Sequence, residues 1–314
     1  MPQGSMIGPF CFPPYSSPLS HIAANHGLSI HLYADDTQLY FSFDADDGEV
    51  SKKAMEDCIE EIRSWMANNM LKLNDAKTEF IILGSKYTLD KLPDIHSLSV
   101  GEDQVLCAST VKNIGATIDE TLSMIPHVHN TTKSCYLHLR HLGQIRKYLT
   151  QEATTTLVHA FITSKLDNLN SLIYGIPDYL IDKLQLIQNQ AAKLILKKKK
   201  FDSVTPLLKT LHWLPVKYRL DYKILLLTYK CLKQQAPIYL SSLLKPYNPT
   251  RSLRSSHKLL LAEPIFRTNT HGARAFSVVA PRLWNQLPKD IKLSDSLTTF
   301  KASLKTYLFR KAFT

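Results

Sequence analysis

The sequence of 314 residues has no long apolar run and little glycine. Because no stretch of about eighteen uncharged apolar residues occurs, the sequence predicts no membrane-spanning helix. Ten glycines and sixteen prolines are too few for a low-complexity or collagen-like chain. The first residues show neither the basic patch nor the apolar stretch of a secretory signal, so we expect an intracellular, non-secreted protein.

Cysteine is also scarce, with five residues that are widely spaced and form no CxxC pair. This odd number and spacing predict reduced, mostly buried thiols rather than disulfides or a zinc site. The hydrolase and nucleotide-binding patterns GxSxG, HExxH and GxxxxGK[ST] are absent as well. These absences disfavour a hydrolase.

Charge is plentiful but unevenly distributed along the chain. Residues 1–124 carry eight basic and eighteen acidic residues, whereas residues 125–314 carry thirty basic and nine acidic residues. This division suggests one region that gathers cations and another that gathers a polyanion such as nucleic acid. Two solvated surfaces of unequal composition are the alternative.

The acidic part reads as a mixture of strands and one helix. Residues 29–43 show two β-prone runs around an acidic pair, with the period-two alternation of a half-buried hairpin. Residues 48–71 place Cys58, Met70 and other apolar side chains at helical spacing. Residues 77–84 and 105–118 are strand-like. Together these elements predict an α+β fold.

The basic part reads as helices separated by short loops that contain proline. Apolar residues recur on one stripe of each expected helix, so we expect these stripes to form the core. One stripe holds Val128, Cys135, Leu142 and Leu149, and another holds Leu184, Ile187, Ala191 and Leu194. The helices are expected within 124–149, 182–200, 216–235, 271–288 and 296–313, with a loop or linker at 246–256.

The sharpest chemical signal is the sequence YADD at residues 33–36, on the expected hairpin. Adjacent carboxylates at a turn can hold Mg²⁺, which prefers a few hard oxygen ligands, close to a reacting phosphate. Two such ions about 3.5 to 4 Å apart would stabilise nucleotidyl transfer. Taken without context, the pair of aspartates is weak evidence, because such pairs commonly end solvated hairpins.

The context is a resemblance to the reverse transcriptases of non-LTR, LINE-type retrotransposons, in particular the Jockey-like clade. Four segments carry it in order: PQGSMIGPF (2–10) resembles the family's motif B, LYADDTQLY (32–40) motif C, SWMANNMLKLNDAKTEFIILG (64–84) motif D and VKNIGATIDETLSM (111–124) motif E. Further similar segments are SKLDNLNSLIYGIP, LQLIQNQAAKLI, LHWLPVKYRLDYKILLLTYKCL and ARAFSVVAPRLWNQLP.

The resemblance implies an RNA-directed DNA polymerase that uses Mg²⁺, an RNA template and a DNA primer. It implies a partial palm at 1–124, a helical thumb-like region at 125–200 and a helical basic C-terminal region at 201–314. It also assigns roles to single residues. Asp35 would be a ligand of the catalytic metals, and Asp36 would be a weaker or structural partner. Tyr33 would lie near the incoming nucleotide, and Gln3 and Gly4 would line the nucleotide and template pocket. Lys77 would protonate the departing pyrophosphate, and the primer would be gripped by Asn113, Ile114 and Gly115. An ordinary strand-entry lysine is the alternative for Lys77.

Two departures from the family pattern bear on activity. The first metal-binding aspartate of the family belongs to a motif that precedes motif B, and this sequence starts within motif B. We therefore expect that this chain by itself does not polymerise DNA, and whether it is an enzyme stays open. Pro13, Pro14 and Pro18 should also break or shorten the helix expected after motif B. The partial palm would also expose sheet edges and apolar faces that the family's preceding segments normally cover, so we expect poor solubility or dependence on a partner.

The basic part offers a second class of function. Lys193 and Lys197–Lys200 gather at a helix end, where they would compensate the helix dipole and either grip phosphates or serve as a nuclear localisation patch. The histidine pairs His127/His129 and His138/His141 are interpreted as surface residues. A nucleic-acid-binding module at 125–314 and an inert retrotransposon remnant are the non-enzyme alternatives. A second basic stretch with interleaved aromatic residues is compatible with RNA or single-stranded DNA, and solvated charge over a helical core is the alternative. It holds Arg251, Arg254, Lys258, Phe266, Arg267, Arg274, Phe276, Arg282 and Trp284.

Overall fold

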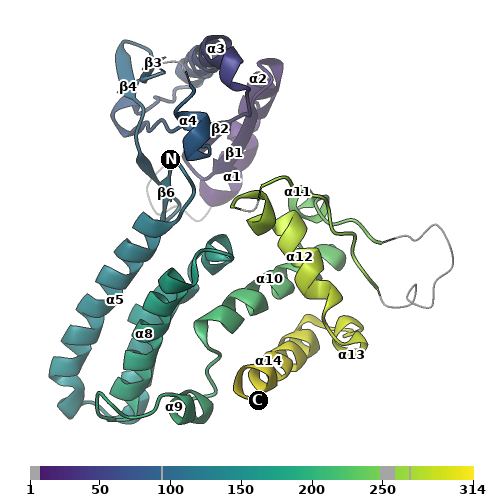
Figure 1. The fold of residues 1–314 in the computed structure, drawn as a ribbon. Helices are drawn as coiled ribbons and strands as arrows, with labels where there is room; N and C mark the ends of the chain where they lie inside the picture. The colour runs from purple at the N-terminus through teal and green to yellow at the C-terminus, as the bar shows by residue number, and fades with distance from the viewer. Residues whose placement is uncertain (1–7, 93–94, 248–258, 269) are drawn as a thin grey trace. The chain divides into compact units, whose positions relative to one another are not determined.

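The computed structural model describes residues 8–92, 95–247, 259–268 and 270–314. The chain divides into two compact units, Met1–Ser123 and Met124–Thr314. Within the described ranges, all strands of more than one residue lie in the first unit, and the second is built from helices (Figure 1). The predicted α+β fold class is therefore confirmed. None of the described helices is long and apolar enough to cross a membrane.

The first unit combines short helices with three separate two-stranded antiparallel sheets. The expected hairpin at 29–43 forms, although its second strand ends three residues earlier. The expected strands at 105–118 also form, in two different sheets. The helices are α1 (Gly8–Ser16), α2 (Leu19–Asn25), α3 (Gly48–Asn68) and α4 (Lys86–Leu89), and the sheets are β1 (Ser29–Tyr33) with β2 (Asp36–Tyr40), β3 (Ser97–Val100) with β4 (Asp103–Leu106), and β5 (Thr110–Asn113) with β6 (Ala116–Asp119).

The core of the first unit lies between α2, α3 and the inner face of the β1–β2 hairpin. Its buried residues are Leu19, Ile22, Ala23, Leu28, Cys58 and Ile62, with Ile30, Leu32 and Leu39 packed against them. The amphipathic helix expected at 48–71 is therefore confirmed, except at its end. Met70, predicted to lie on the apolar stripe, follows the helix and is 94% exposed.

The prolines do not end the first helix where we expected. Pro13 and Pro14 lie inside α1, where they leave two helical N–H bonds unmade. The helix ends at Ser16, whose hydroxyl donates to the carbonyl of Phe12 at 3.0 Å. Pro18 is the N-cap of α2, a position where a helix needs no N–H donor. The break thus falls between α1 and α2, and only Pro18 acts as predicted.

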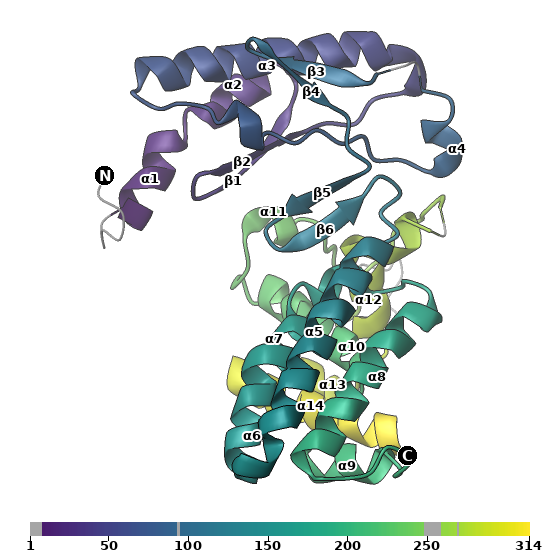
Figure 2. The ribbon, with the colours of Figure 1, turned by 90° about the vertical axis from the view of Figure 1, so that its left-hand side faces the viewer.

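The second unit consists of helices that bury two apolar clusters. The three long helices expected at 124–149, 182–200 and 216–235 are confirmed, and the C-terminal part has two helices flanking a short third one. The principal helices are α5 (Ile125–Ile145), α6 (Gln151–Val158), α7 (Ser164–Asp167), α8 (Asp178–Ile195), α9 (Thr205–Thr210), α10 (Val216–Leu232), α11 (Ile238–Ser241), α12 (Phe276–Asn285), α13 (Lys289–Lys292) and α14 (Leu297–Phe313). Figure 2 shows α5 and α8 packed lengthwise.

The predicted helical stripes coincide with these cores. Val128, Cys135 and Leu142 of α5 and Leu184, Ile187 and Ala191 of α8 all lie in the first cluster. The last member of each stripe, Leu149 and Leu194, is only half-buried. The second cluster joins α10, α12 and α14, where the rings of Tyr229 and Phe300 stack at 4.1 Å. All five cysteines are free thiols, three of them buried, as predicted.

Candidate functional site

The YADD sequence forms the tip of the β1–β2 hairpin. Tyr33 pairs with Asp36, so Ala34 and Asp35 make a two-residue turn between the strands. Ala34 has a φ of 53°, in the left-handed region that costs an L-residue roughly 1–2 kcal/mol and that hairpin turns commonly assign to glycine. The expected position of the acidic pair is therefore confirmed in part: Asp35 lies in the turn, and Asp36 begins β2.

The two faces of the hairpin have different environments. Ile30, Leu32 and Leu39 face the core, whereas Tyr33 is 60% exposed beside Asp36 on the opposite face. Farther along that outer face, the rings of His31 and Tyr40 stack at 5.2 Å between centroids. Since the side chains of Asp35 and Asp36 are both exposed, the carboxylates are accessible to a ligand.

The two carboxylates do not fit a two-metal centre without further ligands. Among the residues that the structure describes, no group of three or more His, Cys, Asp and Glu side chains lies close enough to hold a metal ion. A two-metal centre for nucleotidyl transfer requires several carboxylates around both ions. We therefore derive no catalytic step through a metal ion from the described residues.

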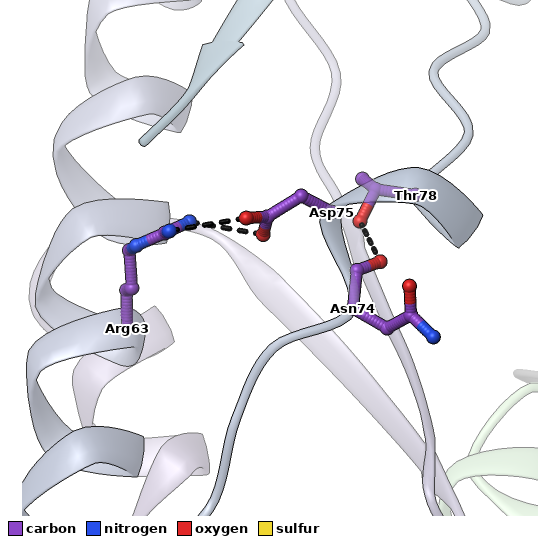
Figure 3. Close-up of polar contacts among 4 residues, drawn as sticks. All are labelled: Arg63, Asn74, Asp75 and Thr78. Carbon is purple, nitrogen blue, oxygen red and sulfur yellow. Dashed lines mark hydrogen bonds and ion pairs between the residues drawn. The ribbon is translucent and has the colours of Figure 1, made fainter. Parts of the chain in front are cut away.

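Lys77 lies in a short 3₁₀ turn, Asp75–Lys77, rather than at the start of a strand. The turn is tied to α3 by Arg63, whose Nη1 and Nη2 donate to the two carboxylate oxygens of Asp75 at 2.9 and 3.0 Å (Figure 3). The hydrogen bond to Asp75 raises the pKa of Arg63. Thr78 closes the turn by donating to the carbonyl of Asn74 at 3.2 Å. The lysine itself is exposed.

The prediction of a strand at 77–84 is wrong. Within this segment only Phe80 forms a bridge, a single parallel one with Cys107. The remaining contacts go to different parts of the chain, including a Gly84 N–H bond to the carbonyl of Glu120 at 2.9 Å. Because strand formation depends on an adjacent partner strand, β-propensity alone did not make this apolar segment a strand.

The proposed primer-grip residues form the turn of another hairpin. Asn113 pairs with Ala116, and Ile114 and Gly115 occupy the turn with φ values of 42° and 82°. Positive φ at both turn positions is the type I′ geometry that suits a two-residue hairpin. Gln38 of β2 donates from Nε2 to Oδ1 of Asn113 at 2.5 Å. This bond joins the turn to the hairpin that carries Asp35 and Asp36.

The structure thus brings some of the predicted site residues together. Tyr33, Asp36 and, through Gln38, Asn113 share one neighbourhood. In the described part of the chain, no hydrogen bond or ion pair joins Lys77 to Asp35 or Asp36. Gln3 and Gly4 lie outside the described residues. The sequence analysis missed Gln38 and Arg63, which act through partners 75 and 12 residues away.

Within the described part of the basic stretch near the C-terminus, three of the expected residues make contacts within the fold. Trp284 is 2% exposed and packs on Phe300, so its ring is unavailable to a base. Arg274 donates to the carbonyl of Tyr174 at 3.1 Å, and Arg282 lies over the ring of Phe266. Arg251, Arg254 and Lys258 lie outside the described residues.

The histidines and the lysine run have different environments. His127, expected at the surface, is only 7% exposed, and burial lowers its pKa. The ring of His138 stacks on Phe161 at 5.1 Å. Lys197–Lys200 follow the end of α8 and are all exposed. The sequence analysis did not single out Arg146, whose buried guanidinium lies beside this lysine run.

Comparison with known proteins gives the site its context. The family model of the reverse transcriptases (RNA-dependent DNA polymerases) matches residues 1–118. The protein described as "Probable RNA-directed DNA polymerase from transposon BS" of Drosophila melanogaster is 26% identical over 209 residues, which cover 62% of this chain and 22% of that protein. No solved structure matches the chain. Residues 1–118 are thus similar to reverse transcriptases, and the matched part of the chain spans about a fifth of the length of the transposon BS protein.

Proposed function

We propose that residues 1–118 act as part of an RNA-directed DNA polymerase, with the tip of the β1–β2 hairpin directed at the reacting nucleotide. The observation that carries this proposal is the position of Asp35 and Asp36 at an exposed hairpin tip within the matched residues. Asp35 is the proposed ligand of Mg²⁺, and Asp36 is a weaker or structural partner. Further ligands are required from outside the described residues, because none lies close enough within them.

The proposal assigns a role to each remaining candidate. An RNA template and a DNA primer are the proposed nucleic acids. Residues 1–124 are the proposed partial palm, 125–200 the thumb-like region and 201–314 the basic C-terminal region. Tyr33 backs the nucleotide, Gln3 and Gly4 line its pocket, Lys77 protonates pyrophosphate, and Asn113, Ile114 and Gly115 contact the primer.

Primer extension by the 314-residue chain tests whether its own residues complete the site. The chain receives a primed RNA template, deoxynucleotides and Mg²⁺ or Mn²⁺. We expect no incorporation above that of the Asp35→Asn variant, because two carboxylates are too few for a two-metal centre. Incorporation by the wild-type chain that disappears in Asp35→Asn would contradict this expectation.

A chimera tests the polymerase role itself. The aligned segment of this chain replaces its counterpart in the transposon BS polymerase. We expect the chimera to extend a DNA primer on an RNA template and expect Asp35→Asn to reduce the rate by at least about a hundredfold, a loss typical of a group that stabilises transition-state charge. The matched control is Asp46→Asn, an exposed carboxylate beyond the hairpin, which should retain the rate. Full activity in the Asp35→Asn chimera would refute the assigned role.

Nucleic-acid binding by the second unit is a second candidate function. The observation that favours it is charge, since thirty basic residues face nine acidic ones over residues 125–314. Binding of this kind releases counterions from the phosphates and weakens steeply with salt. A filter-binding titration of the whole chain with RNA at several salt concentrations tests it, and a slope near zero would exclude it. A nuclear location, suggested by the exposed run Lys197–Lys200, is proposed with this function.

A further inference from the structure

The ends of α5 and α8 lie side by side at one end of the helical unit (Figures 1 and 2). Arg146, which follows α5 directly, holds them together. Its guanidinium donates to the carbonyls of Leu149, Leu194 and Ile195, each at 2.8 Å, and its side chain is buried. The residues that follow each helix are therefore held in one neighbourhood.

The loop after α8 has a defined conformation that exposes four consecutive lysines. Lys197 adopts a left-handed φ of 51°, and the N–H of Lys198 donates to the carbonyl of Lys193 at 2.9 Å, which ends the helix in a Schellman-type turn. Lys193 Nζ donates back to the carbonyl of Lys200 at 2.5 Å. The carboxylate of Asp202 accepts from the N–H of Lys199 at 2.8 Å. These bonds fix the backbone, so the lysine side chains are free to contact a ligand.

Two aromatic rings lie exposed beside these cations. Phe201 is 91% exposed, and Lys200 Nζ lies 5.6 Å from its ring centroid. Tyr148, on the segment after α5, is 77% exposed, and Lys147 Nζ lies 4.8 Å from its ring centroid. Neither ring belongs to the core, so both are available for stacking on a ligand.

The charge of this neighbourhood is not balanced by ion pairs. Within the described ranges, no ion pair involves Lys147, Lys193 or the run Lys197–Lys200. Asp202 uses its carboxylate to hold a backbone N–H, and the other acidic residue nearby in sequence is Glu152. A polyanion would therefore meet six lysines with little competition from acidic side chains.

We propose that this surface, the lysine–aromatic tip formed by Lys147, Tyr148, Lys193, Lys197–Lys200 and Phe201, binds single-stranded nucleic acid. The ammonium groups contact phosphates, and unpaired bases stack on the two rings. Duplexes offer fewer such bases because theirs are already stacked. A membrane anchor would need a continuous apolar face, whereas four lysines separate Phe201 from the end of α8. This inference rests on the nucleic-acid-binding function of the second unit and names its surface and ligand.

Fluorescence anisotropy with the whole 314-residue chain tests the proposal. The probe is a labelled, unstructured single-stranded RNA about 20 nucleotides long, which exceeds the roughly 4–16 nucleotides that a single OB-fold covers. The first variant carries Lys197→Gln, Lys198→Gln, Lys199→Gln and Lys200→Gln. Its matched control carries Lys245→Gln, Lys289→Gln, Lys301→Gln and Lys305→Gln, which remove the same charge from exposed positions elsewhere in the second unit.

We expect the tip variant to lose at least about tenfold more affinity than the control, and its salt slope to fall by about three, since each single-strand phosphate contact contributes about 0.7. Phe201→Ala and Tyr148→Ala should each weaken binding at least about fivefold, the lower limit for loss of one stacked base. The matched aromatic control is Tyr239→Ala, which removes a ring that is 62% exposed on α11.

Four results would overturn the proposal. The first is equal loss in the tip and control lysine variants, which would indicate diffuse charge. The second is unchanged binding in both aromatic variants. The third is tighter binding to a duplex of the same length or to phosphatidylserine vesicles than to the single strand. The fourth is no binding by the wild type at low salt, which would also exclude the second candidate function. If the wild type binds RNA and the tip variants match it, only the tip assignment fails.

Discussion

Glycine at position 101 allows a close approach between two parts of the first unit. It occupies the turn between β3 and β4 with a φ of 62°, and a Cβ there would lie 2.4 Å from Cζ and Nη1 of Arg63. That guanidinium cannot move away freely, because it is bound to both oxygens of Asp75. One residue without a side chain thus lets the β3–β4 turn pack over the ion pair that ties the Lys77 turn to α3.

Substitution of three glycines separates the steric effect from the backbone effect. Gly27 has a φ of 73° but open space around it, so Gly27→Ala should cost about 1–2 kcal/mol through left-handed strain. Gly101→Ala adds the clash with Arg63 and should cost more. Gly143→Ala, within α5 and with open space, should stabilise the protein by about 0.5–1 kcal/mol. Urea unfolding monitored by hydrogen exchange measures the free energy of unfolding of each unit separately. Equal losses for Gly101→Ala and Gly27→Ala would show that Arg63 yields to the new methyl group.

At the residue scale, the sequence predicted positions that depend on local chemistry. The turn at Asp35 follows from two β-prone runs around an acidic pair, which is a short-range signal. The bonds from Gln38 to Asn113 and from Arg146 to the end of α8 link residues 75 and up to 49 positions apart. Single-sequence patterns hold no information about such partners. They therefore could not be predicted, although they position the candidate site and the lysine–aromatic tip.

At the scale of elements, helices were predicted better than strands. A helix satisfies its backbone hydrogen bonds internally, so an apolar stripe such as Val128, Cys135 and Leu142 is enough to reveal both the helix and its buried face. A strand needs a partner, and the apolar segment at 77–84 has only the bridge at Phe80. An apolar stripe cannot identify every buried residue of a helix: His127 is polar, yet it is buried in the first turn of α5.

Burial of His127 within α5 makes the stability of the helical unit depend on pH. Desolvation lowers its pKa below the ordinary value of 6.5. Below about pH 6.5 the unfolded chain therefore binds a proton at this ring that the folded unit excludes, and the free energy of unfolding falls. One such group changes the free energy of unfolding by at most about 1.4 kcal/mol per pH unit. We expect urea unfolding at pH 7.5 and 5.5 to show this loss, and His127→Gln to reduce it.

A matched variant distinguishes His127 from its neighbours. His141→Gln removes an exposed ring from the same helix and should retain the loss of stability at pH 5.5. The pKa of His138 is also lowered, by desolvation and by the charges of Lys165 and His141, so a part of the loss should remain in His127→Gln. An identical pH dependence in His127→Gln and the wild type would assign the effect to other groups.

At the scale of the whole molecule, the two units differ in how much apolar surface they bury. Among the described residues, the core cluster of the first unit has six buried members, whereas the clusters of the second unit have twenty-one and fifteen. The first unit also divides its strands among three separate two-stranded sheets. A two-stranded sheet is marginal in water unless another element packs on it. The sequence predicted the change of architecture near residue 124, but the size of each core emerges only from tertiary packing.

This difference predicts that the first unit unfolds more readily than the second. We expect limited proteolysis of the whole chain to degrade residues 1–123 first and to leave a resistant product that begins near Met124, because local opening needs less free energy where fewer apolar contacts are broken. Mass spectrometry of the products over time gives the measurement.

The core variant Ile62→Ala should accelerate cleavage of the first unit only, because Ile62 is buried in that unit. The matched variant Ile187→Ala should accelerate cleavage of the second unit only, because Ile187 is buried there. Equal resistance of both units in the wild type would mean that the small core and the paired strands stabilise the first unit as well as the helical clusters stabilise the second.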